Sequence, residues 1–385
     1  MPAILVLGAG YAGIEAALRV RRLQPEASVT VVGEGAYFAE RIRLHQKAVG
    51  DVLTRYRIAD MLEPAGAEYV EARAVALLPE AKQVVLSNGA CLGWDILVYA
   101  LGSMVDMNRV PGVAEHALAL DRRTLERLEL ALPGARAVTV VGGGLSGMEG
   151  ASEIAERCQN VRVTWVARGW TEPFCAKAQA HIRRTMARLG VTLVENEQVV
   201  RVDDGRVLTE RGSIATDLCL WAGGFRAPPL AASAGLPVNA RGQLLVDGYL
   251  RVPGTTIFGA GDAACITEAV GSHVHMSCKT ALPMAAHAAD TICALLAGTR
   301  PTRFSFRDGG ICVSLGRRNA VLQTRRLDGT PSFAMTGRPA AFLKEQICRF
   351  TVSALKRERD GKPLRWLRAP AARPDRGTAR MLVSR

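Results

Sequence analysis

The chain has 385 residues, which is too long for a single hydrophobic core and suggests two or three domains. Its 49% hydrophobic and 22% charged content excludes a largely disordered protein. Residues 300–385 carry 20 basic and 6 acidic side chains, a net charge of +14, so residues 1–299 are close to neutral. This distribution argues against a nucleic-acid binder and indicates a neutral body with one cationic end.

The N-terminus reads as a buried strand and not as a secretory signal, because residues 3–7 are apolar and no basic segment precedes them. The most apolar helix candidate, residues 281–298, contains His287 and Asp290 and falls short of the roughly 18–20 apolar residues of a membrane span. We therefore expect a cytoplasmic protein.

A first βαβ unit opens the chain. The strand at residues 3–7 runs into a glycine turn, a helix and a second strand at residues 29–32, after which Glu34 follows. The turn has the spacing GxGxxG: Gly8, Gly10 and Gly13. These glycines allow a tight turn, the approach of a pyrophosphate and close packing of helix on strand, while Glu34 is placed to bind a ribose.

The same unit recurs 134 residues later. A strand at residues 138–141 precedes the second GxGxxG turn: Gly142, Gly144 and Gly147. Arg168 follows the next strand at the position that corresponds to Glu34. One such turn is weak evidence, but two copies in matching contexts predict that the chain binds two dinucleotides.

A third glycine turn, Gly261 followed by Asp262, ends the segment 254–262. With residues 97–102, which end at Gly102, it resembles the two-dinucleotide-binding-domain flavoproteins of the pyridine nucleotide-disulfide oxidoreductase superfamily. The resemblance implies FAD on the first unit, held also by Asp262, and a nicotinamide dinucleotide on the second. The implied fold is α/β, with two Rossmann-like dinucleotide-binding domains and a small C-terminal element.

The domain boundaries follow from this fold. We expect an FAD-binding domain in two parts, residues 1–108 and 236–305, split by an inserted NAD(P)H-binding domain at residues 113–230. Residues 306–385 would form a C-terminal acceptor or interface element with a basic tail.

The nine cysteines include no C-x-x-C or C-x4-C pair, so a redox-active disulfide is not expected. Residues 310–321 and 336–343 resemble the C-terminal region of type II NADH:quinone oxidoreductases, which implies a quinone acceptor. That family's pair of glutamines after the Gly-Asp turn is missing, because no glutamine occurs between Gln243 and Gln323. The resemblance therefore leaves the identity of the acceptor open.

Three side chains are candidates for catalysis. Glu149 occupies the last position of a GxGxxGxE pattern, which in relatives lies near the nicotinamide. Lys279 precedes a helix expected from about Ala281, whose N-terminal dipole would face the flavin. His45 belongs to a segment that resembles the family's flavin-facing loop, as does Arg41, a candidate flavin-binding residue. His45, Arg41 or His275 is the expected proton donor to a reduced acceptor. No metal site is predicted, because His273 and His275 have no third ligand nearby.

Together these features predict an FAD-dependent NAD(P)H oxidoreductase that reduces a quinone-like acceptor. Arg168 stands where an NADH enzyme carries an acid, so NADPH is the expected coenzyme and NADH the alternative. Two other functions remain open. One is sulfide:quinone oxidation by cysteines brought together in space, with Cys265, Cys278 and Cys312 as candidates. The other is an NAD(P)H-sensing flavoprotein that binds a partner through its basic end.

The segment from about residue 338 has helical apolar spacing, with basic side chains between the apolar ones. We expect it to form a detachable helix on an anionic membrane surface, which would place the protein at the inner membrane face. The alternatives are packing on the FAD domain or on a twin subunit in a homodimer. Lys344, Arg349, Lys356 and Arg357 are the cations of this helix.

Overall fold

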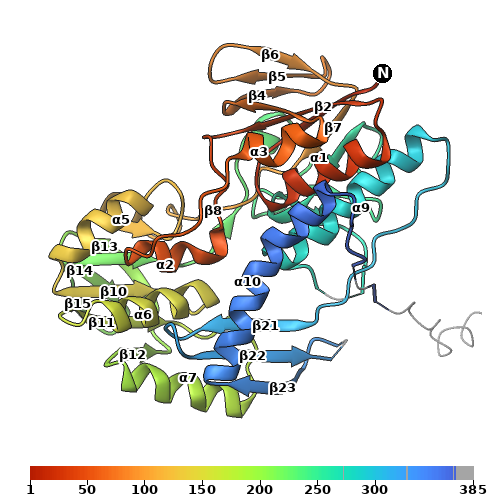
Figure 1. The fold of residues 1–385 in the computed structure, drawn as a ribbon. Coiled ribbons are helices and arrows are strands. Elements are labelled where there is room, and N and C mark those ends of the chain that lie inside the picture. Colours follow the sequence, from red (N-terminus) through yellow and green to blue (C-terminus); the bar gives the residue numbers. More distant parts are fainter. Residues whose placement is uncertain (272, 327, 367, 370–385) are drawn as a thin grey trace, which may run out of the picture.

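The computed structural model describes residues 1–271, 273–326, 328–366 and 368–369. Two five-stranded parallel sheets carry the fold, one in the upper and one in the lower half of Figure 1. The first sheet has the order β19-β7-β1-β2-β3, and the second has the order β12-β11-β10-β16-β9. The chain therefore has the α/β fold with two Rossmann-like units that the repeat predicts.

The first sheet combines four strands from residues 3–99 with one strand from residues 257–259. Its strands are β1 (Ala3–Leu7), β2 (Ser28–Gly33), β3 (Glu68–Glu71), β7 (Ile96–Tyr99) and β19 (Ile257–Gly259). Helices α1 (Tyr11–Leu23) and α9 (Cys278–Leu296) pack against each other beside this sheet. β1 is buried along almost its whole length because it pairs with β2 on one side and β7 on the other.

The second sheet lies wholly between residues 117 and 221. Its strands are β9 (Ala117–Ala119), β10 (Ala137–Val141), β11 (Arg162–Ala167), β12 (Thr192–Glu195) and β16 (Leu218–Trp221). Its helices are α4 (Val113–His116), α5 (Leu125–Ala131), α6 (Leu145–Arg157) and α7 (Ala176–Arg188). The interruption of the first sheet by the second fits the inserted domain, whose boundaries at 113 and 230 stay a prediction.

Smaller elements complete the two halves. Three small sheets are formed by β4 (Ala74–Leu78), β5 (Gln83–Leu86) and β6 (Cys91–Gly93), by β13 (Val199–Asp203), β14 (Arg206–Thr209) and β15 (Ser213–Ala215), and by β18 (Leu244–Val246) and β20 (Ala264–Ile266). β8 (Met104–Val105) pairs with β17 (Phe225–Arg226) where the chain passes between the halves. The short helices are α2 (Leu44–Ala48), α3 (Ile58–Leu62) and α8 (Leu230–Ser233), with 3-10 turns at Arg41–Arg43, Glu63–Ala65, Leu132–Gly134 and Gly261–Ala263.

Helix α9 begins earlier than the sequence suggested. It starts at Cys278, with Ser277 before it, and not at about Ala281. Lys279 is therefore part of the first turn, and Pro283 lies in the second turn. The N-terminus of α9 therefore lies close to Asp262, and the backbone N–H of Ser277 helps to lower the pKa of that carboxyl.

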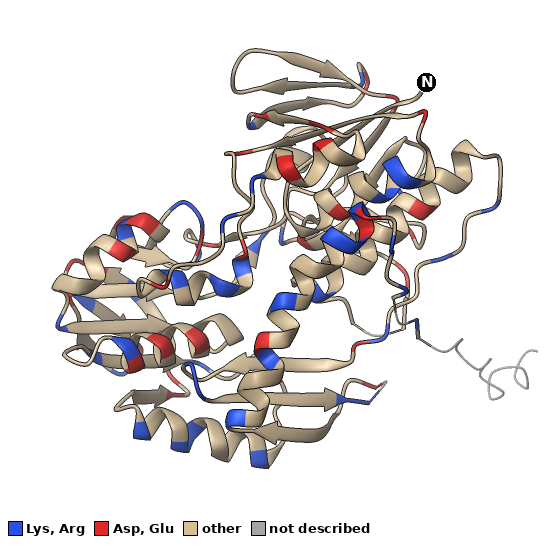
Figure 2. Cartoon of the chain, in the orientation of Figure 1, with Lys and Arg blue, Asp and Glu red and all other residues tan. Residues whose placement is uncertain are grey.

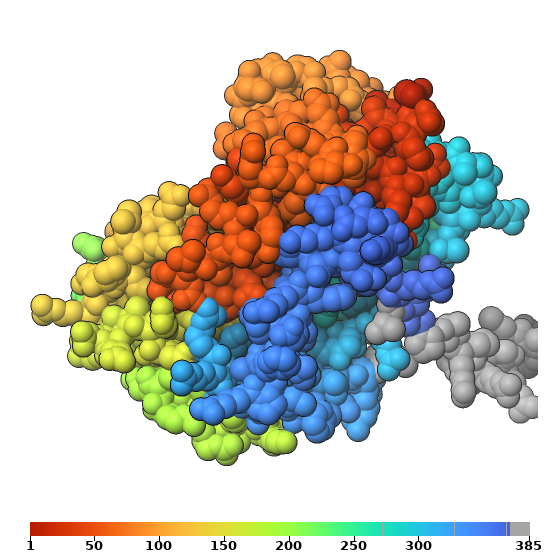
Figure 3. All heavy atoms as spheres, viewed as in Figure 1, coloured from red at the N-terminus to blue at the C-terminus, as the bar shows by residue number. Residues whose placement is uncertain are grey.

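The C-terminal element is an antiparallel sheet followed by a long helix. The strands are β21 (Gly310–Ser314), β22 (Ala320–Arg325) and β23 (Pro331–Thr336), and α10 spans Arg338–Arg359. Figure 1 shows α10 rising from this sheet to α1, so that the helix joins the lower half to the upper half. In the space-filling view it lies on the surface along its whole length (Figure 3).

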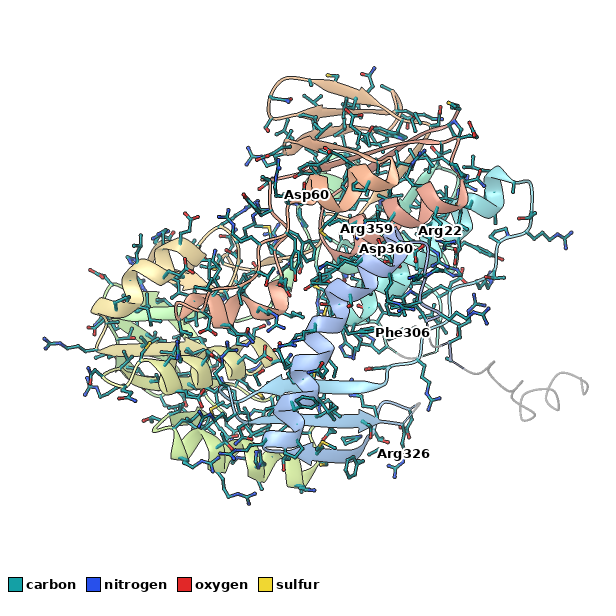
Figure 4. All side chains as sticks on the ribbon, viewed as in Figure 1. Arg22, Asp60, Phe306, Arg326, Arg359 and Asp360 are labelled. Atoms are coloured by element: carbon teal, nitrogen blue, oxygen red, sulfur yellow. The ribbon has the colours of Figure 1, made fainter. Side chains whose placement is uncertain are left out.

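Helix α10 is not detachable, which corrects the sequence-based expectation. Its inner face is buried, and Val352, Ala354 and Leu355 belong to the core around the first sheet. Near its C-terminal end, Glu358 is almost fully buried and pairs with Arg19 and Arg22 of α1 at 3.2 and 2.9 Å. Figure 4 labels Arg22 beside the end of α10. Removal of α10 would expose the core and take the carboxylate of Glu358 away from Arg19 and Arg22.

No helix among the described residues has the length and apolar character needed to cross a bilayer. The basic tail, residues 370–385, lies outside the described residues. Trp366 packs on the core and meets Phe350 edge to face, at a ring distance of 6.4 Å. It therefore contacts protein, although basic residues lie close to it in the sequence.

Candidate functional site

One cavity of about 1900 Å³ connects the two halves at the carboxyl ends of both parallel sheets. This is the edge at which open α/β sheets bind ligands. Thirteen of the residues proposed from the sequence line it: Gly8, Gly10, Glu34, Arg41, His45, Gly102, Gly142, Gly144, Glu149, Arg168, Gly261, Asp262 and Lys279. Gly13 and Gly147 do not line it, because they lie where helix and turn pack together.

The two glycine turns have the same geometry. A Cβ at Gly13 would lie 1.6 Å from the carbonyl oxygen of Gly8, and a Cβ at Gly147 would lie 2.1 Å from that of Gly142. Gly8 and Gly142 also have positive φ angles of +109° and +135°. Neither turn could accept a larger residue without moving, so both bring backbone N–H groups of a helix N-terminus to the cavity wall.

Asp262 places its carboxylate on the cavity wall of the first unit. Its Oδ2 accepts a hydrogen bond of 2.7 Å from Ser103 Oγ, and Ser103 Oγ is 3.2 Å from Arg41 Nη1. Its Oδ1 is buried and has no hydrogen-bond partner among the described residues. Burial raises the pKa of Asp262, although Arg41 and Ser103 oppose this shift. A buried acceptor that faces a cavity requires a donor.

The residues of the first unit therefore fit FAD. The Gly8 turn and the start of α1 can bind its pyrophosphate, and Glu34 can bind its adenosine ribose. Oδ1 of Asp262 can accept a hydrogen bond from a hydroxyl of its ribityl chain. The Gly142 turn and the start of α6 offer the same cradle to a nicotinamide dinucleotide.

Glu149 lies at the center of a buried charge cluster. Its Oε1 is 3.1 Å from Lys344 Nζ and accepts a 3.1 Å hydrogen bond from the backbone N–H of Ser314, and its Oε2 is 3.7 Å from His45 Nδ1. Burial alone would raise the pKa of Glu149, but Lys344, His45 and Ser314 hold it below its ordinary value. Burial would also lower the pKa of Lys344, yet Glu149 keeps it well above its usual range.

His45 is the neutral member of this cluster. Burial lowers its pKa to about 4, and its Nε2 has no hydrogen-bond partner among the described residues. At neutral pH it therefore carries no proton that it could give up as an imidazolium. This weakens the role of proton donor that the sequence assigned to it.

Lys279 does not bring an unpaired charge to the cavity. Its Nζ lies 2.5 Å from Asp308 Oδ1 and donates a 2.8 Å hydrogen bond to the carbonyl oxygen of Gly310. Asp308 is also 3.2 Å from Arg325 Nη1, and Arg325 pairs with Glu172 and contacts His275 Nε2 at 3.2 Å. The charge of Lys279 is thus neutralised, and the dipole of α9 remains as the source of positive potential at this wall.

Arg168 is exposed at the end of β11 and lines the cavity. Figure 2 shows basic and acidic residues on the helices, strands and loops of both halves. Gly169, Thr171 and Glu172 of the same loop also line the cavity. The position is therefore accessible to the adenosine end of a dinucleotide held by the Gly142 turn.

All nine cysteines are free. Cys278 and Cys312, which the sequence singled out, line the cavity together with Cys348, whereas Cys265 does not. Burial raises the pKa of Cys278 to about 12 and that of Cys348 to about 11. These thiols are therefore protonated at neutral pH and poor nucleophiles. No cluster of His, Cys, Asp and Glu in the described part of the chain could hold a metal ion.

Lys344 is a site residue that could not be recognised from its charge, because it reads as one of the surface cations of α10. Its position carried a signal, however. Lys344 falls on the same helical stripe as Ala340, Cys348 and Leu355, all of which are buried. A lysine within an apolar stripe needs a buried partner, and Glu149 is that partner.

The comparisons with known proteins agree with this geometry. The sequence pattern of the pyridine nucleotide-disulphide oxidoreductase family matches residues 2–290. An NADH dehydrogenase-like protein of Mycobacterium tuberculosis is 30% identical over 321 residues, which cover 75% of this chain and 79% of that protein. A type II NADH:quinone oxidoreductase of Staphylococcus haemolyticus is 25% identical over 388 residues, covering 89% of this chain and 93% of that protein.

Among solved structures, the sulfide:quinone oxidoreductase of Aquifex aeolicus superposes with a TM-score of 0.79. The superposition covers 93% of this chain and 92% of the Aquifex aeolicus chain, and the sequence identity is 17%. At this identity the likeness concerns the fold alone.

Proposed function

The chain belongs to the pyridine nucleotide-disulphide oxidoreductase family, and we propose that it is an FAD-dependent NAD(P)H oxidoreductase that reduces a quinone-like acceptor. One observation carries the proposal: the two glycine turns and Asp262 open on a single cavity, so both dinucleotides can meet inside it. Relatives named as quinone oxidoreductases support the choice of acceptor.

FAD, when bound, accepts a hydride from the nicotinamide and passes two electrons to the acceptor. The residues of this chain hold the two dinucleotides so that this transfer is direct. The Gly8 turn binds the pyrophosphate of FAD, and the Gly142 turn binds that of the nicotinamide dinucleotide. Glu34 binds the adenosine end of FAD, and Arg168 binds that of the coenzyme. Asp262 and Arg41 bind the central part of FAD. The N-terminus of α9 supplies positive potential, because its first N–H groups have no partners within the helix.

Reduction of a quinone by NAD(P)H consumes one proton from water in addition to the hydride. Lys344 is the group of this cluster that carries a proton at neutral pH, because Glu149 keeps its pKa well above its usual range. Lys344 also lines a second cavity of about 560 Å³, whose walls include Arg43, Glu40 and Asp51. We assign the proton supply to Lys344, because it is protonated and borders both spaces, while His45 is neutral and Glu149 is ionised.

The coenzyme preference is proposed to be NADPH over NADH. Arg168 would form charge-assisted hydrogen bonds with a 2′-phosphate, where a carboxylate would repel it. The guanidinium of Arg168 is accessible, because the residue is exposed and lines the cavity.

Sulfide oxidation is a second candidate, because Cys278, Cys312 and Cys348 line the same cavity. The raised pKa values of Cys278 and Cys348 argue against it, since the thiolate is the reactive form. Quinone reduction by NAD(P)H needs no thiol, and we favour it.

The outer face of α10 is proposed to rest on an anionic membrane surface at the inner membrane face. Phe342, Leu343, Ile347 and Phe350 are between 37% and 64% exposed on it. Ile347 and Phe350 also line the large cavity, so an apolar acceptor could enter beside this face. Arg338, Arg349, Lys356 and Arg357 are exposed around it. A second copy of the chain, in a homodimer, is the alternative cover for the same face.

The test is anaerobic stopped-flow reduction of the FAD-loaded protein by NADPH, followed by mixing with ubiquinone and menaquinone analogues, ferredoxin or oxygen. We expect rapid flavin reduction and rapid reoxidation by a quinone. Flavin that is reduced once and then stays reduced with every acceptor would favour the sensor function. Flavin reduction by sulfide but not by NADPH or NADH would favour sulfide oxidation.

A further inference from the structure

The loop between β11 and α7, residues 168–175, is held from two sides by different parts of the chain. We call it the coenzyme loop, because Arg168, Gly169, Thr171 and Glu172 line the cavity next to the Gly142 turn. The inference below rests on the proposed function, in which this loop binds the adenosine end of NAD(P)H.

One side of the coenzyme loop contacts the glycine turn itself. The backbone N–H of Thr171 donates a 3.1 Å hydrogen bond to the carbonyl oxygen of Gly143. A Cβ at Gly143 would lie only 1.8 Å from the carbonyl oxygen of Gly169. The loop therefore lies directly against the turn that cradles the coenzyme's pyrophosphate.

The other side is held by β22 of the C-terminal sheet, which lies next to α7 in Figure 1. Gln323 is fully buried, and among the described residues its side chain bonds only to the backbone of this loop. Its Oε1 accepts a 2.7 Å hydrogen bond from the N–H of Cys175, and its Nε2 donates a 2.9 Å hydrogen bond to the carbonyl oxygen of Pro173. These bonds fix the loop backbone at two points.

Arg325, two residues further along β22, holds the loop by charge. Its side chain is 5% exposed and pairs with Glu172 of the coenzyme loop. Its other nitrogen lies 3.2 Å from Asp308, which pairs with Lys279 in the first turn of α9. The loop at the adenosine end is thus connected through Arg325 to the helix that faces the flavin.

We propose that Gln323 and Arg325 are positioning residues for the coenzyme: they fix the loop that carries Arg168 and thereby set the affinity for NAD(P)H and the preference for NADPH. Both residues lie beyond residue 290, where the family pattern ends. The dinucleotide-binding unit of the family therefore depends here on an element that is not part of the matched region.

A purely structural role would make a different prediction. If the two residues only stabilised the fold, their loss would lower the melting temperature and the FAD content without changing the selection between coenzymes. A positioning role changes the dissociation constant and KM of the coenzyme and the selection between NADP⁺ and NAD⁺.

The experiment compares Gln323→Leu with Thr324→Val, its neighbour on the same strand. Thr324 Oγ1 bonds to the backbone of Phe333 within the hairpin and not to the coenzyme loop, so it is a matched control for lost hydrogen bonds. Arg325→Lys is compared with Arg326→Lys, since Arg326 is exposed at the outer end of the sheet (Figure 4). The FAD-loaded variants are titrated with NADP⁺ and NAD⁺ by calorimetry.

We expect Gln323→Leu to weaken NADP⁺ binding about tenfold and to reduce the NADP⁺ over NAD⁺ preference, while Thr324→Val behaves as the wild type. In a background of Arg168→Ala, the effect of Gln323→Leu on the preference should disappear, because it acts through the position of Arg168. If Gln323→Leu loses its FAD, Gln323→Glu replaces it: its ionised carboxylate keeps an acceptor for the N–H of Cys175 and places a second acceptor opposite the carbonyl oxygen of Pro173, so that this hydrogen bond is lost.

The outcomes separate the two proposals. Unchanged affinity and preference in an FAD-loaded Gln323 variant would overturn the positioning role alone. Absence of binding of either coenzyme to the FAD-loaded wild type would overturn the proposed function and the positioning role with it.

Discussion

The ammonium group of Lys344 on α10 lies 3.1 Å from Oε1 of Glu149 on α6, and each side chain is only 11% exposed. This pair joins the C-terminal helix to the start of the second glycine unit. Each charge is stable in the protein interior only because the other is present.

The first prediction concerns the pH dependence of this pair. In Lys344→Met, Glu149 loses its cation, and burial should raise its pKa above the value of about 4.5 for an exposed glutamate. A group whose pKa is raised by folding stabilises the protein below its unfolded pKa, and this contribution is lost as the pH rises through its folded pKa. We therefore expect the variant to lose stability between pH 5 and pH 8, on the order of 3 kcal/mol at the upper end.

The measurement is urea unfolding at several pH values. The double variant Lys344→Met with Glu149→Gln is the control, because it has neither charge and should show no such slope. A Lys344→Met variant as stable at pH 8 as at pH 5, relative to the wild type, would show that Glu149 is not buried as described.

The second prediction concerns Glu15 on α1, which is buried and whose Oε2 has no hydrogen-bond partner among the described residues. Burial, reinforced by Glu358, raises its pKa to about 8. The wild type therefore loses stability as the pH rises from about 4.5 to about 8. Glu15→Gln should remove this loss and gain stability relative to the wild type, on the order of 2–4 kcal/mol at pH 8 and much less at pH 5.

Thermal melting at pH 5 and pH 8 tests this, with Glu26→Gln as the control for an exposed glutamate. An equal shift of the melting temperature at both pH values would contradict the raised pKa of Glu15.

The third prediction is a change of coenzyme preference in Arg168→Glu. The arginine can bind a 2′-phosphate with charge-assisted hydrogen bonds of roughly 1.5–3 kcal/mol, and the glutamate would repel it. The ratio of kcat/KM for NADPH over NADH should fall by at least about tenfold. The assignment is wrong if this ratio is the same in the wild type and in the variant.

The fourth prediction is that hydride transfer to FAD involves no thiol. Cys278, Cys312 and Cys348 line the cavity and are replaced by alanine one at a time. In each variant, NADPH should reduce the flavin at the wild-type rate. Stopped-flow absorbance follows the flavin, and titration with a thiol reagent before and after turnover should count the same number of free thiols. Loss of flavin reduction in one FAD-loaded variant would mean that this cysteine takes part.

The fifth prediction concerns the membrane surface. Truncation at Gly337 is unsuitable as a test, because α10 belongs to the core. Instead, Phe342→Ser with Phe350→Ser should abolish co-sedimentation of the full chain with vesicles that contain phosphatidylserine at low salt. Phe333→Ser is the control, since Phe333 is 58% exposed on β23 and its ring lies 5.9 Å from Lys177 Nζ of α7. Equal pelleting of all three proteins, or none by the wild type, would rule out the membrane role. A salt-independent dimer of the wild type, lost in the double variant, would assign the face to a second copy.

The sequence by itself determined the two dinucleotide-binding units. A glycine turn between a buried strand and a helix is a local structure, and its requirements, such as the positive φ of Gly8 and the close contact of Gly13 with Gly8, involve residues within one turn of each other. The parallel sheets follow from the same local pattern, because a strand, a helix and a second strand in succession fold in one way. The positions of Glu34, Arg168 and Asp262 at strand ends could therefore be predicted.

Only the tertiary structure decided how the C-terminal residues serve these units. Lys344 meets Glu149, Gln323 meets Pro173 and Cys175, and Arg325 meets Glu172, each across more than 140 residues of chain. A basic residue in a sequence with 36 acidic ones has many possible partners, and no local pattern selects among them. The packing of β22 and α10 against the second half makes the selection, because it buries these side chains and a buried polar group must find its partner within reach.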